Sequence, residues 1–171
     1  MTLLFLLRRK GGYMELTDRE WKEFPLTSLV SISHGRRLTK ADRITGTIPL
    51  MTAGAANQGV AEFVSNCCDQ HRNFVSVDMF GNSFYKNYAT VGDDNIYFLT
   101  SEKMSEAIGL FIATCINQQK EKFDYGKQVR EKVLQRFRVL LPVADDGQPD
   151  YDFMEQYIKD LMLKKYFQYL V

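Results

Sequence analysis

The stretch MSEAIGLFIATCI, residues 104–116, decides the fold of this chain of 171 residues. Its apolar side chains recur at steps of three and four, which is the period of one face of an α-helix. Ser101 or Ser105 can accept hydrogen bonds from the free N–H groups of the first turn. The pattern predicts a helix with its apolar face against the core. The residues on that face are Met104, Ala107, Ile108, Phe111, Ile112, Cys115 and Ile116.

The part of the chain before this helix alternates short apolar segments with turns. Gly, Asn and Asp gather between the segments, as they do in β-turns, so this half is expected to be β-rich. Pro25 separates a turn-like start from the first segment. We expect strands at residues 29–32, 48–52, 60–64, 74–77, 84–89 and 96–99.

Behind the helix, a basic stretch leads to a strand at residues 139–143 and a turn at 145–149. Pro149 and Asp150 then suit the start of a last helix, because proline presets φ and the carboxylate caps free N–H groups. We expect this helix, residues 149–171, to dock on a partner or a second copy, because no later segment can cover its apolar face. That face contains Phe153, Met154, Tyr157, Ile158, Leu161, Met162, Lys165 and Tyr166.

Composition places the chain among ordinary globular proteins, with 45% hydrophobic and 25% charged residues. The formal net charge is only +1, so an argument for nucleic-acid binding depends on local basic stretches such as residues 34–43 and 120–138. Cys67, Cys68 and Cys115 are odd in number and lack the spacing of a disulfide framework, which favours a reducing cytoplasm. The apolar run at 3–7 is too short to cross a membrane, and we interpret residues 1–13 as a leader.

Several kinds of catalytic site are absent or weakly indicated. Neither glycine-rich phosphate loop occurs, and the prolines are never adjacent as they are in the loop by which DNA amino-methyltransferases hold a base. The triplet at 20–22, Glu-Trp-Lys, has the spacing of a magnesium nuclease but lacks a suitable upstream carboxylate. Residues 67–71 offer zinc ligands, although adjacent cysteines fit one tetrahedral ion poorly, and His34 could pair with either cysteine in a nucleophilic site.

Two polar segments carry groups that suit DNA. HGRRLTK, residues 34–40, places guanidinium and ammonium groups on one loop, where they can bind phosphates and guanine edges, although solvated loops are often charged as well. TAGAANQG, residues 52–59, combines small residues with amides that can bind adenine, unless it is simply a wide hairpin turn. We expect contacts to DNA, on one face, from His34, Arg36, Arg37, Lys40, Arg43, Thr52, Asn57, Gln58, Asn82, Ser83, Tyr85, Lys86 and Lys127.

Taken in chain order, short motifs between residues 16 and 158 resemble the DNA-specificity domain of type I restriction-modification S subunits and of the related BcgI-like enzymes. GQPDYDFMEQYI at 147–158 is the most distinctive and resembles the BcgI-like branch. The other motifs are WKEFPL at 21–26, ISHG at 32–35, IPLMT at 48–52, NQGVAEFV at 57–64, GNSFY at 81–85, FDYGK at 123–127 and LLPV at 140–143.

This resemblance implies an α+β fold, with an irregularly wound β-rich recognition domain at 14–148, a core helix and a C-terminal scaffold helix. It implies that the domain reads double-stranded DNA without catalysis, cofactor or metal of its own. Partner methyltransferase subunits would carry S-adenosylmethionine, and a restriction subunit would cut. Family subunits usually hold two recognition domains, so one domain here suggests a half-subunit or a truncated product. The alternative is a protein-interaction module that acts through the aromatic C-terminal helix without DNA.

Overall fold

The computed structural model describes residues 13–67 and 69–170, and the expected leader therefore lies outside the description apart from Tyr13. The largest sheet is antiparallel and has the order β2 (Ser31–His34), β8 (Ile96–Thr100), β5 (Phe74–Asp78) and β6 (Ser83–Lys86). A smaller sheet has the order β4 (Val60–Val64), β3 (Thr45–Met51) and β7 (Val91–Gly92). A third sheet pairs β1 (Trp21–Pro25) with β9 (Arg138–Pro142).

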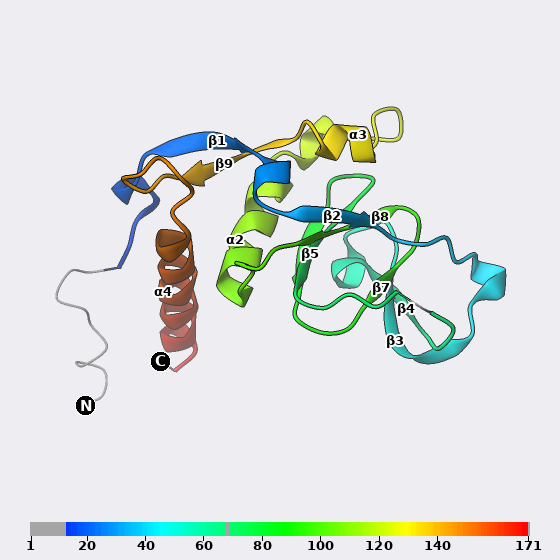
Figure 1. Cartoon of the computed structure of the whole chain (residues 1–171). Helices are drawn as coiled ribbons and strands as arrows, with labels where there is room; N and C mark the ends of the chain where they lie inside the picture. Colours follow the sequence, from blue (N-terminus) through cyan, green and yellow to red (C-terminus); the bar gives the residue numbers. More distant parts are fainter. Residues whose placement is uncertain (1–12, 68, 171) are drawn as a thin grey trace.

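The helices are α2 (Glu106–Asn117), α3 (Glu131–Leu134) and α4 (Tyr151–Tyr169). Short 3-10 turns connect the strands and are η1 (Leu16–Asp18), η2 (Leu26–Ser28), η3 (Lys40–Asp42), η4 (Ala56–Gly59) and η5 (Lys120–Lys122). The α+β class predicted from the sequence is confirmed, and Figure 1 shows α2 between the β-rich lobe and α4. No described helix combines the length and apolar character that a membrane span requires.

Strand β5 is buried on both of its faces, and this arrangement builds two cores. Val75 and Val77 point toward α2 and belong to the main core, which also contains Ile108 and Ile112 of that helix. Phe74 points the other way, under the β3 layer. Since successive side chains of a strand alternate between faces, one apolar strand holds the two layers together.

Helix α2 lies where the periodicity predicts it, and Ser105 rather than Ser101 caps it. The Ser105 hydroxyl accepts a hydrogen bond from the backbone N–H of Ile108 at 3.3 Å. Gly109 allows the helix to approach β6 closely, because a Cβ at that position would lie 2.2 Å from the ring of Tyr85. Glycine therefore weakens helix propensity here but permits the close packing between helix and sheet.

Three expected elements are wrong in detail. The turn-like start before Pro25 is strand β1, which tolerates the proline because it pairs with a strand on one side only. The strand expected at 29–32 begins only at Ser31, after a 3-10 turn that buries Leu26. The strand expected at 84–89 ends at Lys86. In each case tertiary contacts determine the boundary, which local residue preferences do not specify.

Helix α4 begins at the predicted cap. The Asp150 carboxylate accepts hydrogen bonds from the backbone N–H of Phe153 at 2.8 Å and from Nε of Arg19 at 2.7 Å. Burial alone would raise the pKa of Asp150, but these bonds outweigh it and lower the pKa below its ordinary value. The same carboxylate therefore fixes the start of α4 and ties it to the N-terminal segment.

We expect Asp150→Ala to lower the free energy of unfolding by about 0.5–2 kcal/mol, the usual cost of losing a helix cap. Asp150→Asn should cost less, because its amide oxygen still caps α4. Because the folded pKa is depressed, the carboxylate stabilises the fold at neutral pH, and this contribution is lost as pH falls through the folded pKa. Urea titrations at neutral and acidic pH test this. Equal stability of all three proteins at neutral pH would contradict it.

Candidate DNA interface

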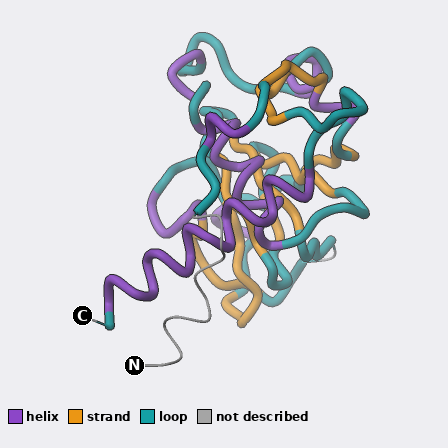
Figure 2. Tube along the Cα trace, turned by 90° about the vertical axis from the view of Figure 1, so that its left-hand side faces the viewer, coloured by secondary structure: helices purple, strands orange, loops and turns teal. Residues whose placement is uncertain are grey.

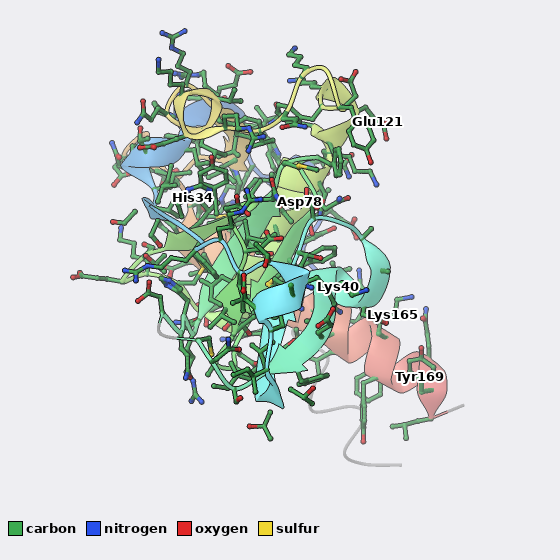
Figure 3. The ribbon with its side chains drawn as sticks, turned by 90° about the vertical axis from the view of Figure 1, so that its right-hand side faces the viewer. His34, Lys40, Asp78, Glu121, Lys165 and Tyr169 are labelled. Atoms are coloured by element: carbon green, nitrogen blue, oxygen red, sulfur yellow. The ribbon has the colours of Figure 1, made fainter. Side chains whose placement is uncertain are left out.

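Three connecting segments leave the four-stranded sheet at the same end. His34 ends β2 and pairs with Tyr97 of β8, while the neighbouring Ile96 pairs with Asp78 at the end of β5. The segment 35–43, the turn before β8 and the turn after β5 therefore start side by side. Figure 3 shows His34, Lys40 and Asp78 from the side of the molecule on which these segments lie.

Asp78 joins two of the segments predicted to meet DNA. Its carboxylate, 3% exposed, accepts from the backbone N–H groups of Phe80 and Asn82 at 2.8 and 2.9 Å, and from the Asn82 amide at 2.9 Å. It also accepts from the backbone N–H of Gly54 at 2.7 Å. A buried carboxylate requires such partners, and satisfying it attaches the 52–59 loop to the turn around Asn82.

The segment 36–43 forms one wall of a polar hollow of 480 Å³. Arg37, Lys40 and Arg43 line it together with Arg130, which directly precedes α3 in the basic stretch far along the chain. Asp93 and Asp94 line it as well. Arg37 has only a loose pair with Asp94 at 3.4 Å, and both side chains are well exposed. Such a pair contributes little stability, so the guanidinium remains accessible to an anion.

Arg43 differs from its neighbours because it is held inside the fold. Its side chain is 15% exposed and pairs with Glu62 of β4 at 2.9 Å, and its Nε donates to the carbonyl of Leu38. Arg36 is exposed but pairs with Asp69. Arg43 therefore shapes the hollow, while Arg37, Lys40 and Arg130 are the cations best placed to meet a phosphate.

His34 has a supporting position at the edge of this surface. Its ring stacks on Tyr97 with a centroid separation of 4.4 Å, and its Nε2 lies 2.8 Å from the carbonyl oxygen of Asp94. Asp93, which precedes Asp94 in the turn, is 8% exposed, and burial raises the pKa of its carboxyl group. Together these residues fix the turn that forms the floor beneath Arg37.

The segment with Lys127 lies beside the turn around Asn82. The backbone N–H of Val129 donates to the carbonyl of Met79 at 2.8 Å, and the rings of Tyr125 and Phe80 meet edge to face at 5.0 Å. Lys127 itself is exposed. The basic stretch 120–130 thus extends the surface from the hollow toward the 52–59 loop.

Side chains of β6 alternate between the two faces of the sheet, and both faces are covered, so some residues predicted to contact DNA are buried. Ser83 is 2% exposed, and its backbone exchanges two hydrogen bonds with the amide of Asn117 in α2. Tyr85 packs on α2 and donates to Asn73 at 2.8 Å. Lys86 is 1% exposed and faces the other layer. Ser83 and Lys86 are therefore buried supports of the loops, whereas Tyr85 is partly buried against α2.

The remaining candidates belong to the 52–59 loop, which is closed by a hydrogen bond from the backbone N–H of Thr52 to the carbonyl of Gly59 at 2.9 Å. Asn57 and Gln58 are exposed at its tip, whereas Thr52 is half-buried at its base. Of the predicted residues, Arg37, Lys40 and Arg43 line the same hollow, His34 contacts Asp94 at its edge, and Arg36 lies apart with Asp69. Asp78 links the loop of Asn57 with that of Asn82.

Among the residues that the structure describes, the ligands of the two metal sites considered from the sequence do not come together. Across residues 13–67 and 69–170, no three His, Cys, Asp or Glu side chains come together as metal ligands. Cys68 lies outside the described residues, Asp69 pairs with Arg36, and His71 stacks on Phe98 at 3.9 Å. Trp21 packs against Phe111, so the nuclease triplet lies at the start of β1, the strand that packs on α2 through this residue.

These features define a domain with an irregular β-rich lobe, a basic surface and a projecting helix. Residues 18–167 match the family described as type I restriction modification DNA specificity domain, and the chain belongs to that family. Over 149 residues it is 36% identical to the specificity subunit S.BcgI of a type II restriction enzyme from Heyndrickxia coagulans, with 84% of this chain covered. The chain spans 44% of that relative.

Solved structures share the fold at lower identity. The type I restriction-modification S subunit from M. genitalium matches with a TM-score of 0.64 and 17% identity, over 90% of this chain and 41% of that chain. The HsdS subunit from Thermoanaerobacter tengcongensis matches with a TM-score of 0.58 and 14% identity, over 91% and 40%. The predicted α+β fold, an irregularly wound β-rich domain with a core helix and a C-terminal helix, is confirmed by these likenesses.

We expect Arg130→Ala and Arg37→Ala to weaken binding to all duplexes alike, because a phosphate contact carries no sequence information. Each should reduce the slope of log affinity against log salt by about 0.9, the contribution of one neutralised phosphate. Lys165→Ala is the matched control, because Lys165 lies on α4, which is on the other side of α2 from the segment around residue 40 (Figure 1). Fluorescence titrations at several salt concentrations provide the measurement. If the Arg37→Ala/Arg130→Ala double variant keeps the wild-type slope of log affinity against log salt, the hollow does not contact DNA.

Proposed function

We propose that this chain reads a short sequence in double-stranded DNA as the specificity part of a restriction-modification system. The observation that carries the proposal is the hollow of 480 Å³, where Arg37, Lys40 and Arg130, from distant parts of the chain, line one surface. With Arg43 these basic residues outnumber the two carboxyl groups of the hollow, Asp93 and Asp94. Cations gathered at one place bind phosphates, and loops with exposed amides beside them read base edges. Family membership supports the same function.

The chemistry of modification and cleavage belongs, in this proposal, to other subunits. Methyltransferase and restriction subunits would act on the DNA that this domain selects, in the cytoplasm where that DNA lies. The domain would need neither cofactor nor metal of its own. Its contribution is to position the catalytic subunits through sequence readout, so that affinity for one duplex over others is its measurable activity.

Helix α4 is proposed as the docking element at residues 149–171. Its first turns are buried at Phe153 and Met154, whereas Met162, Tyr166 and Tyr169 are 43%, 59% and 86% exposed. These residues follow helical spacing and form one stripe. Figure 2 shows the end of α4 extending beyond the sheets.

An apolar groove of 600 Å³ between α2, α4 and the β1–β9 pair continues this stripe inward. Trp21, Phe111, Leu140 and Leu161 line it, and such a surface favours the apolar face of another helix. The chain spans 44% of S.BcgI, so one candidate to fill the groove is a second copy of this chain, which would supply a second recognition domain. The other candidate is a helix of a methyltransferase subunit. A pure interaction module would use this surface alone and leave the basic hollow unused.

DNA binding is tested by selecting from a random duplex library with the 171-residue chain. We expect one duplex to be enriched and to bind at least about tenfold more tightly than its scrambled version, because a single mismatched pair costs about 1–3 kcal/mol. Its affinity should fall steeply with salt through counterion release. Binding that ignores both sequence and salt would instead favour the interaction module, since apolar association responds little to salt.

Docking is tested with the Met162→Glu/Tyr166→Glu double variant, which places charge on the exposed stripe. We expect self-association, or capture by the methyltransferase subunit, to be lost while thermal stability stays nearly unchanged, since exposed substitutions usually alter stability by no more than about 0.5 kcal/mol. Gln168→Glu adds a charge at another exposed position of α4 and serves as control. Sedimentation velocity, with and without the partner, gives the masses. Equal association of both variants and the wild type would make α4 a structural cap only.

A further inference from the structure

The tip of the 52–59 loop has an unusual backbone. Asn57 and Gln58 both have positive φ, 48° and 52°, and Gly59 follows at 82°. Side chains other than glycine rarely adopt this left-handed conformation, and two in succession persist only where surrounding contacts enforce them. Such a loop is held in one shape before any ligand arrives.

Lys86 supplies the enforcing contact. Its side chain is 1% exposed, and its Nζ donates to Oε1 of Gln58 at 3.2 Å. The same ammonium lies over the rings of Phe84 and Tyr88, at 5.7 and 5.5 Å from their centroids. No ion pair among the described residues includes Lys86. A buried ammonium without a carboxylate depends strongly on these neutral partners, so the loop and Tyr88 are tied to it.

Asn57 is left free by this arrangement. Its side chain is exposed and makes no hydrogen bond to any described residue. It borders a hollow of 400 Å³ whose other walls include Phe63 and Tyr88, 55% and 41% exposed. An amide with both its donor and its acceptor available therefore stands beside two exposed aromatic rings.

We propose that Asn57 and the rings beside it form a contact site for an A·T base pair in the major groove, with Lys86 as the positioning residue. The proposal rests on the proposed function and names the chemistry of one of its contacts. An amide can donate to adenine N7 and accept from its amino group at the same time. The ring of Phe63 offers apolar surface for the methyl group of thymine in the same pair or the next one.

Gln58 has a different role from Asn57, although the sequence presents them as equivalent amides. Its Oε1 already accepts from Lys86, so one of the two acceptor positions of that oxygen is occupied inside the fold and the amide is oriented by that bond, whereas no such bond to a described residue holds the amide of Asn57. Gln58 therefore anchors the loop, and Asn57 reads. Glutamate at position 58 keeps an acceptor for Lys86 but has no amide donor for adenine N7, so this substitution separates the two roles.

The experiment is selection from a random duplex library with the full chain, followed by titration of the enriched duplex and of duplexes altered at each position. We expect Asn57→Ala to lose discrimination at one A·T pair by about ten- to hundredfold, the range of one bidentate contact. Its salt slope should stay unchanged, because the amide carries no charge. Gln58→Glu should keep the base preference, whereas Gln58→Met and Lys86→Met should lose it. Thermal unfolding verifies that each variant is folded.

Uracil in place of thymine removes only the methyl group and tests the aromatic wall. The wild-type chain should bind the uracil duplex several-fold more weakly, and Phe63→Ala should bind both duplexes equally. Selection that persists unchanged in Asn57→Ala would overturn the inference while leaving the proposed function intact. Loss of the preference in Gln58→Glu, with retention in Asn57→Ala, would make Gln58 the reader. A wild-type chain that selects no sequence would overturn both proposals.

Discussion

Burial of the Asp78 carboxylate is the constraint on which the recognition surface depends. Strand β5 runs between two apolar layers, and Asp78 is the point where it leaves them, still 3% exposed. A carboxylate in that position is stable only when its oxygens receive hydrogen bonds. The turn after β5 and the loop at Gly54 provide those bonds, so the loops that carry exposed amides are shaped by the needs of the core.

In β6, as in β5, successive side chains point to opposite faces of the sheet, and this decides where its polar residues lie. Side chains that face α2 become part of the helix packing, as Tyr85 does against Gly109, and those that face the other layer become internal supports, as Lys86 does. The exposed amide of Asn57, by contrast, lies at a loop tip. A net charge of +1 is compatible with a basic surface because Arg37 and Arg130 are brought together, while acidic groups such as Asp145 and Asp152 gather near the start of α4.

The two surfaces of the domain are well separated. The segment 35–43, which forms one wall of the hollow, and the outer half of α4 lie on opposite sides of α2 (Figure 1). Helix α2 contacts α4 and both β5 and β6, so it is the rigid element between the docking stripe and the reading loops. Tyr157 of α4 packs edge to face on Phe111, which itself stacks on Trp21, and this aromatic contact fixes the angle at which α4 leaves the body.

The sequence by itself determined the α+β class, the position of α2 from its helical period, the cap of α4 at Asp150, and the family, because these depend on local spacing and on short motifs in order. Tertiary structure alone decided which predicted contact residues are accessible. Lys86 lies within the strand expected at 84–89 and Ser83 directly before it, but the sequence does not show that both faces of this strand are covered, and in the structure both side chains are buried. Arg130 joins Arg37 only because the fold closes a long stretch of chain, and no local pattern reports a contact of that kind. Sequence preferences act over a few residues, whereas burial and charge clustering are properties of packed layers.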